Sequence, residues 1–336
     1  MHNIDMNYLN VRTDLAIEQI DSDSINSIIN DNIKVTSIDI DDKKSNLLNK
    51  KKGKYITIEF DDITDYNSNK KVEEVLINEL NKMLDSLKLT DDDSCLVIGL
   101  GNEKSTPDSL GPLSINNIIV TNHFYNLGIN VEKGFRAVSA FNPGVMGQTG
   151  IETSDIINAV VEKQKPSFII VVDSLKASSV DRLNKTIQIT NAGINPGSGI
   201  GNNRKEISSD ILKIPVIAIG VPTVVDTTTI VNDTFNYITN HFTYMKNNID
   251  NPGEKLKIVR TNINRNNIND NDKKELFGLI GNLNEQELKQ LIKEVLNPIG
   301  YNMIVTTKEI DFQIDKLSML IGNGINNTLH KNVTHL

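Results

Sequence analysis

Two aspartates stand where apolar strands end, and they are the residues of this chain best placed to do chemistry. Asp108 follows the apolar stretch Leu96–Leu100 after a short loop, and Asp173 comes directly after Phe168–Val172. Two carboxylates that face one crevice cannot both be ionised at low cost, so one of them holds a proton near neutral pH. Such a pair activates a water molecule with one member and protonates a leaving amine with the other. The pattern therefore indicates hydrolysis of an amide bond.

Each aspartate also has other interpretations. Thr106-Pro107-Asp108 is a typical helix start, and Asp108 or Asp173 would serve as the N-cap of a following helix. The same two carboxylates would also suit a divalent metal ion, with Glu152 or Asp155 as a third ligand. The residues alone leave these alternatives open.

Other types of site fit the sequence less well. A Ser-His-Asp or Cys-His site needs a histidine near the chemistry, and no histidine stands in a Gly-rich loop or at a clear strand end. The histidines are His2, His123, His241, His330 and His335. Gly99-Leu100-Gly101 lacks the third glycine of a dinucleotide fingerprint, and the chain has no His-Glu-x-x-His or Walker-type motif.

Composition excludes several classes of protein. A net charge of −8 argues against a basic face that binds nucleic acid directly. No apolar run approaches the roughly 20 residues that span a bilayer, and Met1–Met6 lacks the features of a signal peptide. Cys95 is the only cysteine, so no internal disulfide forms, and we expect a cytosolic type of compartment.

The elements that must position the aspartates read as an α/β fold. The strands with the aspartates are unbroken apolar runs, typical of parallel strands covered on both faces, and ligands bind beyond the carboxyl ends of such strands. Strands are predicted at 55–60, 95–99, 168–172, 185–190 and 216–220. Helices are predicted at 72–87, 113–125, 226–245, 285–296 and 308–320, and Thr149 with Glu152 forms a capping-box pattern for another.

The ends and one internal stretch differ from this core. We expect a single peptidase domain over 15–336, with an N-terminal arm at 15–54 and a polar insertion at 247–271. Within the arm region, 21–31 reads as a loop. Asp14-Leu15-Ala16 places an acidic residue before an apolar residue and alanine, which is a candidate cleavage site between Asp14 and Leu15.

Several motifs together resemble the germination proteases of endospore-forming Firmicutes, over nearly the whole chain. They are Val11-Arg-Thr-Asp-Leu-Ala16, Gly99-Leu-Gly-Asn102, Thr106-Pro-Asp108, Pro143-Gly-Val-Met-Gly147, Thr149-Gly-Ile-Glu-Thr-Ser-Asp155, Asn195-Pro-Gly-Ser-Gly199, Arg204-Lys-Glu-Ile-Ser208 and Ile219-Gly-Val-Pro-Thr-Val-Val-Asp226. The fold of that family is similar to that of hydrogenase maturation peptidases. The resemblance therefore implies a three-layer α/β/α sandwich around a mostly parallel twisted sheet, with an N-terminal arm and C-terminal helices.

The resemblance also implies an activity. Members of the family are made as inactive homotetrameric zymogens and remove a short N-terminal propeptide, here residues 1–14, by cutting between Asp14 and Leu15. During germination they begin the degradation of small acid-soluble spore proteins in the cytoplasm of the forespore and spore core. The family's two proposed catalytic aspartates fall on Asp108 and Asp173, and the resemblance favours an aspartic-type endopeptidase without metal or other cofactor.

The chain departs from the family pattern at two places. Ser174-Leu-Lys-Ala-Ser178 replaces an alanine-rich stretch that ends in arginine, and Asn195 stands where many members have histidine. Lys176 offers a positive charge near Asp173 instead, and Arg204 lies in a shared motif. The alternative functions are a metallopeptidase that uses the same aspartates as ligands, and a non-catalytic protein that binds spore proteins.

Overall fold

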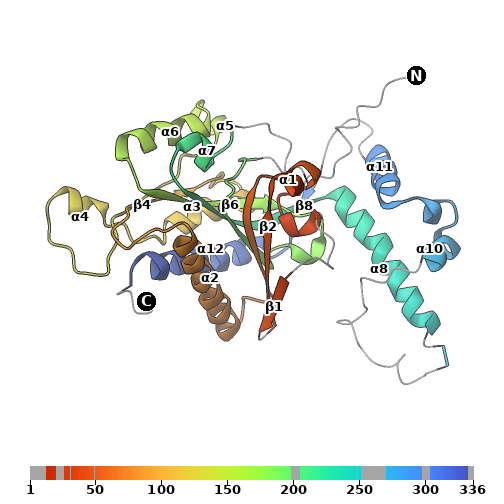
Figure 1. The fold of residues 1–336 in the computed structure, drawn as a ribbon. Helices are drawn as coiled ribbons and strands as arrows, with labels where there is room; N and C mark the ends of the chain where they lie inside the picture. Colours follow the sequence, from red (N-terminus) through yellow and green to blue (C-terminus); the bar gives the residue numbers. More distant parts are fainter. Residues whose placement is uncertain are drawn as a thin grey trace. The chain divides into compact units, whose positions relative to one another are not determined.

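The computed structural model describes residues 13–19, 26–30, 32–48, 50–197, 205–247, 249–250, 270–296 and 303–331 (Figure 1). The chain divides into two compact units. The larger unit comprises Arg12–Ala177, Asp181–Val224 and Thr306–Leu336, and the smaller one comprises Met1–Val11, Ser178–Val180 and Val225–Val305. Every described residue of the candidate site belongs to the larger unit.

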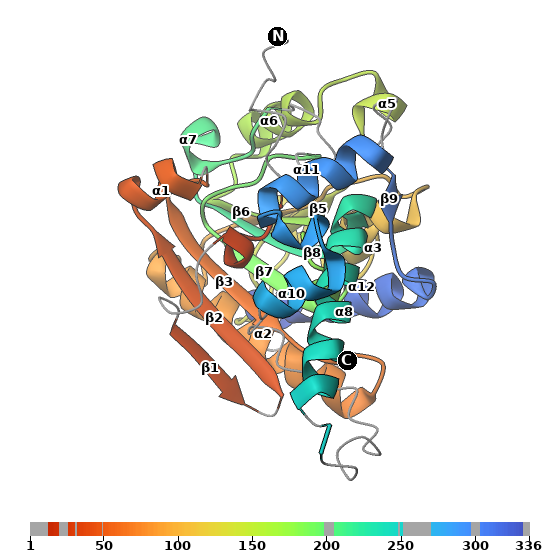
Figure 2. The ribbon, with the colours of Figure 1, turned by 90° about the vertical axis from the view of Figure 1, so that its right-hand side faces the viewer.

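A mixed β-sheet lies at the centre of the larger unit. In spatial order its strands are β1 (Asn26–Asn30), β2 (Ile33–Ile40), β3 (Gly53–Glu59), β7 (Thr186–Thr190), β8 (Val216–Asp226), β6 (Phe168–Lys176), β4 (Cys95–Gly99) and β5 (Val138–Phe141). The four strands β8, β6, β4 and β5 run parallel, and they include both predicted aspartate strands. Antiparallel pairing of β7, β3, β2 and β1 then extends the sheet to its far edge (Figure 2).

Helices cover both faces of this sheet. On one face lie α2 (Tyr66–Ser86), α3 (Leu110–Ile115) and α12 (Ile310–Leu329), with α12 packed on both α2 and α3. On the other face lie α6 (Thr153–Gln164) and α7 (Ser209–Leu212) (Figure 1). The structure confirms the predicted α/β/α arrangement.

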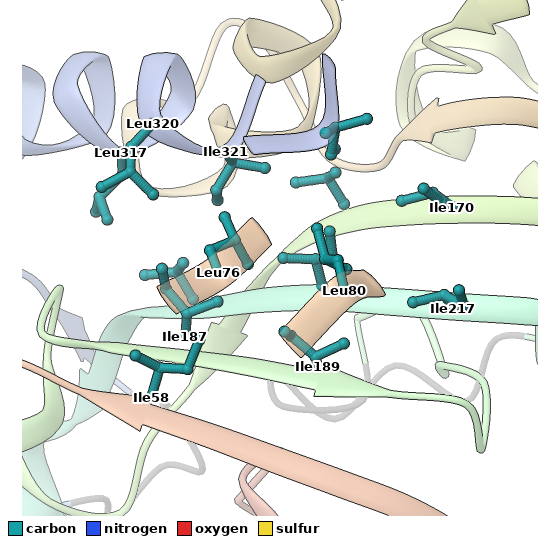
Figure 3. Close-up of a cluster of buried hydrophobic side chains, with 14 of the residues drawn as sticks. Ile58, Leu76, Leu80, Ile170, Ile187, Ile189, Ile217, Leu317, Leu320 and Ile321 are labelled. Atoms are coloured by element: carbon teal, nitrogen blue, oxygen red, sulfur yellow. The ribbon is translucent and has the colours of Figure 1, made fainter. Parts of the chain in front are cut away.

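The larger apolar core lies between one face of the sheet and the helices α2 and α12 that cover it. Val72, Leu76, Leu80 and Met83 recur at helical spacing along α2 and are all buried. Figure 3 shows Leu76 and Leu80 against isoleucines of the sheet and against α12. The strands β6, β4 and β8 are buried on both faces, which agrees with their continuous apolar runs. These buried strands position the residues at their ends.

Local structure differs from the sequence prediction at several places, of which three concern the type of element. The helix predicted at 113–125 is two short helices, α3 and α4 (Asn122–Asn126). Thr149 ends the short helix α5 (Met146–Thr149), and its hydroxyl accepts from the Ile151 N–H at 3.1 Å, whereas Glu152 stands at the N-cap position of α6 and makes no side-chain capping bond. Part of the loop predicted at 21–31 is strand β1, which pairs with β2, and α1 (Asp42–Leu48) follows.

The smaller unit is mostly helical in its described part. α8 (Thr227–Asn247) packs on α10 (Asp270–Phe277) and α11 (Glu285–Leu296), and β9 (Ile304–Val305) pairs with the end of β8. The rings of Phe235 and Phe277 meet edge to face, with their centroids 4.9 Å apart. Most of the predicted insertion 247–271 lies outside the described residues. No helix in the described part of the chain is long and apolar enough to cross a bilayer.

Candidate active site

Asp173 lies where β6 loses its partner on one side. β4 pairs with β6 only as far as Gly99 and Val172, so Asp173 is the first residue of β6 without a β4 partner. On its other side it still pairs with Gly220 of β8. Its side chain is buried, with the residue only 5% exposed, and Oδ1 accepts a hydrogen bond of 2.9 Å from the Ser174 backbone N–H. The strand does not end at this aspartate but continues for three residues, to Lys176.

Asp108 closes the short 3-10 turn η4 (Thr106–Asp108), which follows β4. The backbone N–H of Asn102 donates to both the carbonyl oxygen and Oδ2 of Asp108, at 2.9 Å each. The Thr223 hydroxyl, on β8, donates to the Pro107 carbonyl at 2.6 Å. These bonds hold the turn, and with it the Asp108 carboxylate, from the loop after β4 and from strand β8.

Close backbone approaches bring the two aspartates to the same edge of the sheet. The Leu100 N–H donates to the Val172 carbonyl at 2.8 Å, so the chain after β4 stays bonded to β6 just before Asp173. Gly101 has a φ of +115°, and a Cβ there would lie 2.0 Å from the Asp108 carbonyl oxygen. A Cβ at Gly111, in α3, would lie 2.6 Å from the Val172 carbonyl oxygen. The turn with Asp108 therefore packs directly on the ends of β4 and β6.

The predicted cleavage site is docked on the same strand as Asp173. The backbone N–H of Asp14 donates to the Lys176 carbonyl at 3.1 Å, and the Lys176 N–H donates to the Asp14 carboxylate at 2.9 Å. Leu15 and Ala16 are completely buried, and Ala16 begins the 3-10 turn η2 (Ala16–Gln19). The Asp14–Leu15 peptide bond is thus held inside the fold.

A side-chain amide from β7 binds the two sides of this peptide bond. Gln188 Nε2 donates to the Asp14 carbonyl at 3.2 Å, and Gln188 Oε1 accepts from the Ala16 N–H at 2.7 Å. Gln188 pairs with Gly220 across β7 and β8, and Gly220 pairs with Asp173 across β8 and β6. Residues paired across neighbouring strands project to the same face, so Gln188 and Asp173 share a face, about 10 Å apart at the backbone.

Positive charge surrounds the docked segment. Lys50 Nζ donates to the Thr13 carbonyl at 2.8 Å. Burial lowers the pKa of Lys50, and the carboxylates of Asp14 and Glu18 partly oppose this shift. Glu18 is itself paired with Arg182, at 3.6 Å. The segment is therefore anchored by charges at both ends.

The other predicted supporting residues are dispersed. Glu152 stands at the N-cap position of α6 without a side-chain capping bond, and Asp155 in the first turn of α6 pairs with Lys205 at 2.8 Å. Lys176 is buried and contacts the arm through its backbone. Asn195 is exposed beside the bridge between Ile194 and Ile207. Arg204 and residues 1–12 of the predicted propeptide lie outside the described residues.

The described residues include no group of three His, Cys, Asp or Glu side chains arranged to hold a metal ion. Asp155, one of the two residues predicted as a third metal ligand, pairs with Lys205.

Sequence reasoning missed Gln188, Lys50 and the role of Asn102. Gln188 had a signal, because Thr186–Thr190 alternates polar and apolar residues and so places Gln188 opposite the core-facing Ile187 and Ile189. Lys50 and Asn102 had none, since Lys50 bonds a residue distant in sequence and Asn102 donates through its backbone N–H, which does not depend on residue type.

Comparisons with known proteins agree with these motifs. A family model described as germination protease matches residues 3–335. A germination protease of Bacillus velezensis is 44% identical, one of Bacillus licheniformis 43% and one of Bacillus subtilis 42%. Each match covers 98% of this chain and 96% of the relative.

Proposed function

Because this chain belongs to the germination protease family, and is thereby an endopeptidase of spore germination, we propose that Asp108 and Asp173 form its catalytic pair. The observation that carries this proposal is their common position. Asp108 closes a turn that packs on β6, and Asp173 is the first residue of β6 beyond β4. Carboxylates delivered to the carboxyl ends of adjacent parallel strands stand where α/β folds bind their ligands.

The reaction is hydrolysis of a peptide bond by an activated water. One ionised carboxylate takes a proton from the water as its oxygen attacks the carbonyl carbon. The other carboxyl, protonated at the start, gives its proton to the leaving nitrogen. The buried surroundings of Asp173 favour a shared proton, since two neighbouring anions with little water around them are costly.

The chain's own arm is the first substrate. Residues 1–14 act as a propeptide, residues 15–336 as the peptidase, and the cut falls between Asp14 and Leu15. Docking of Asp14 on Lys176, three residues beyond Asp173, supports this assignment. While docked, the arm occupies the edge of β6 and keeps other polypeptides away.

After processing, the substrates are the small acid-soluble spore proteins of the forespore and spore core. These proteins would offer the same pattern of an acidic residue, an apolar residue and alanine. We extend the proposal to a homotetramer in the cytoplasm, which light scattering of the purified full chain would test.

The deciding experiment is intact mass after incubation of the full chain at mildly acid pH with excess chelator. Wild type should lose residues 1–14. Asp173→Asn and Asp108→Asn should each slow this loss by about 10²–10⁴-fold, the usual contribution of a general acid or base. Asp92→Asn is the matched control, because Asp92 is exposed and has no part in the candidate site.

Two results would overturn the proposal. Cleavage that stops in chelator and returns with zinc would make the enzyme metal-dependent. Equal background cleavage by wild type and Asp173→Asn would indicate a protein that only binds spore proteins.

A further inference from the structure

The contacts around Asp14 form a small binding site of complementary groups. Several polar groups of Thr13–Ala16 bind partners on the sheet or near it. The Asp14 N–H donates to the Lys176 carbonyl, and the Asp14 carboxylate accepts from the Lys176 N–H. The Asp14 carbonyl accepts from Gln188 Nε2. The Ala16 N–H donates to Gln188 Oε1, and the Thr13 carbonyl accepts from Lys50 Nζ.

These groups distinguish an acidic residue from others. The Lys176 N–H donates to the Asp14 carboxylate, and a hydrogen bond to a charged group is stronger than a neutral one. An apolar side chain at this position would leave the N–H without its acceptor in a buried place, which is costly. The primary amide of Gln188 supplies a donor and an acceptor at fixed spacing, so it also fixes the register of the segment.

We propose that Gln188 and the Lys176 backbone form the subsite that binds the acidic residue before the cleaved bond. In the intact chain the occupant is Thr13–Ala16, and once the arm has left, the occupant is an acidic segment of a second polypeptide. This inference rests on the proposed function, since it assigns the docked bond as the one to be cut. Gln188 is a positioning residue here, because it binds the segment and takes no proton.

The first test measures docking without catalysis, by hydrogen exchange of the full chain with Asp173→Asn. Adding Gln188→Met, which keeps the length of the side chain and removes both bonds, should speed exchange of the Ala16 amide about tenfold. Amides of β7 should keep their protection. Thr186→Val is the matched control, because Thr186 is buried on the same face of β7 and its hydroxyl has no partner among the described residues.

The second test measures catalysis with Asp173 intact. Gln188→Met should slow loss of residues 1–14 by about tenfold or more, whereas Thr186→Val should not. Asp14→Asn, which keeps an acceptor for the Lys176 N–H, should be cut faster than Asp14→Ala. With the processed protein, a synthetic peptide of the sequence Val11–Glu18 should show a raised KM and little change of kcat in Gln188→Met.

The outcomes separate the two proposals. Unchanged exchange at Ala16 in Gln188→Met overturns the subsite, whatever the protease activity is. Faster exchange with unchanged cleavage and unchanged KM also overturns it, because docking would then not serve recognition. If wild type never cleaves, the proposed self-processing fails, while the exchange experiment still decides whether the subsite exists.

Discussion

Gly101 illustrates how a single residue without a side chain fixes the candidate catalytic geometry. Its backbone adopts a φ of +115°, which L side chains rarely adopt, and the Asp108 carbonyl lies where its Cβ would be. The Asn102 N–H that follows it bonds Asp108 twice. The position of the Asp108 carboxylate thus depends on backbone atoms of the preceding loop.

Gly101→Ala should therefore impair activity more than it impairs folding. The new methyl group would meet the Asp108 carbonyl at 2.0 Å and push turn η4 away from the sheet. We expect at least about a hundredfold slower self-cleavage, comparable to the loss of one general acid or base, measured by intact mass. Gly147→Ala is the control, since a Cβ there meets nothing within 4 Å. Equal rates in the two variants would contradict this account of Asp108.

At the scale of elements, the sequence predicted the strands with the aspartates well and the short helices poorly. Phe168–Val172 is continuously apolar, and such a run has little alternative to a strand covered on both faces. The break between α3 and α4 depends on a distant residue. Asn326 of α12 accepts from the Ile119 N–H and donates to the Asn117 carbonyl, which satisfies the backbone where the helix stops. Docking of Asp14 on Lys176 was likewise beyond a sequence argument, because it is a tertiary contact.

The packing of α2 gives a prediction about stability. Leu80 is completely buried between the sheet and α12 (Figure 3). Leu80→Ala should lower the free energy of unfolding by about 2–5 kcal/mol, because it removes buried methyl groups and leaves a cavity. Urea denaturation followed by circular dichroism measures this change. Leu127→Ala, at a position 71% exposed, should cost far less; a similar loss in both would refute the assigned core.

At the scale of the whole molecule, a histidine at the end of α12 bonds to distant segments of the larger unit. His330 is buried, its Nδ1 accepts from the backbone N–H of Arg136 at 3.2 Å, and its Nε2 lies 3.1 Å from the Ile119 carbonyl oxygen. Burial lowers the pKa of His330 below its usual 6.5, and the nearby Arg136 lowers it further, against the raising effect of the Ile119 carbonyl. The folded chain therefore favours the neutral ring.

This shift has a defined consequence for stability against pH. Well above pH 6.5 the ring is neutral in the folded and unfolded states, so His330 causes no loss of folding stability there. As pH falls below 6.5, the unfolded state binds a proton first, so stability falls until the lowered folded pKa is passed. Urea midpoints of wild type should drop between pH 7 and pH 5 more than those of His330→Asn. The exposed His123→Asn should follow wild type, and parallel curves for all three would refute the role of His330.

The complete burial of Leu15 has a consequence for the direction of the proposed self-cleavage. Cutting the bond before it would turn a neutral amide into two new ions, an ammonium on Leu15 and a carboxylate on Asp14. Holding these two ions away from water costs several kcal/mol per ion, which their mutual attraction only partly offsets. The new end must then leave for water and take its neighbours with it. Resealing would require the same desolvation in reverse, so the proposed cleavage would favour release of the arm over resealing of the bond.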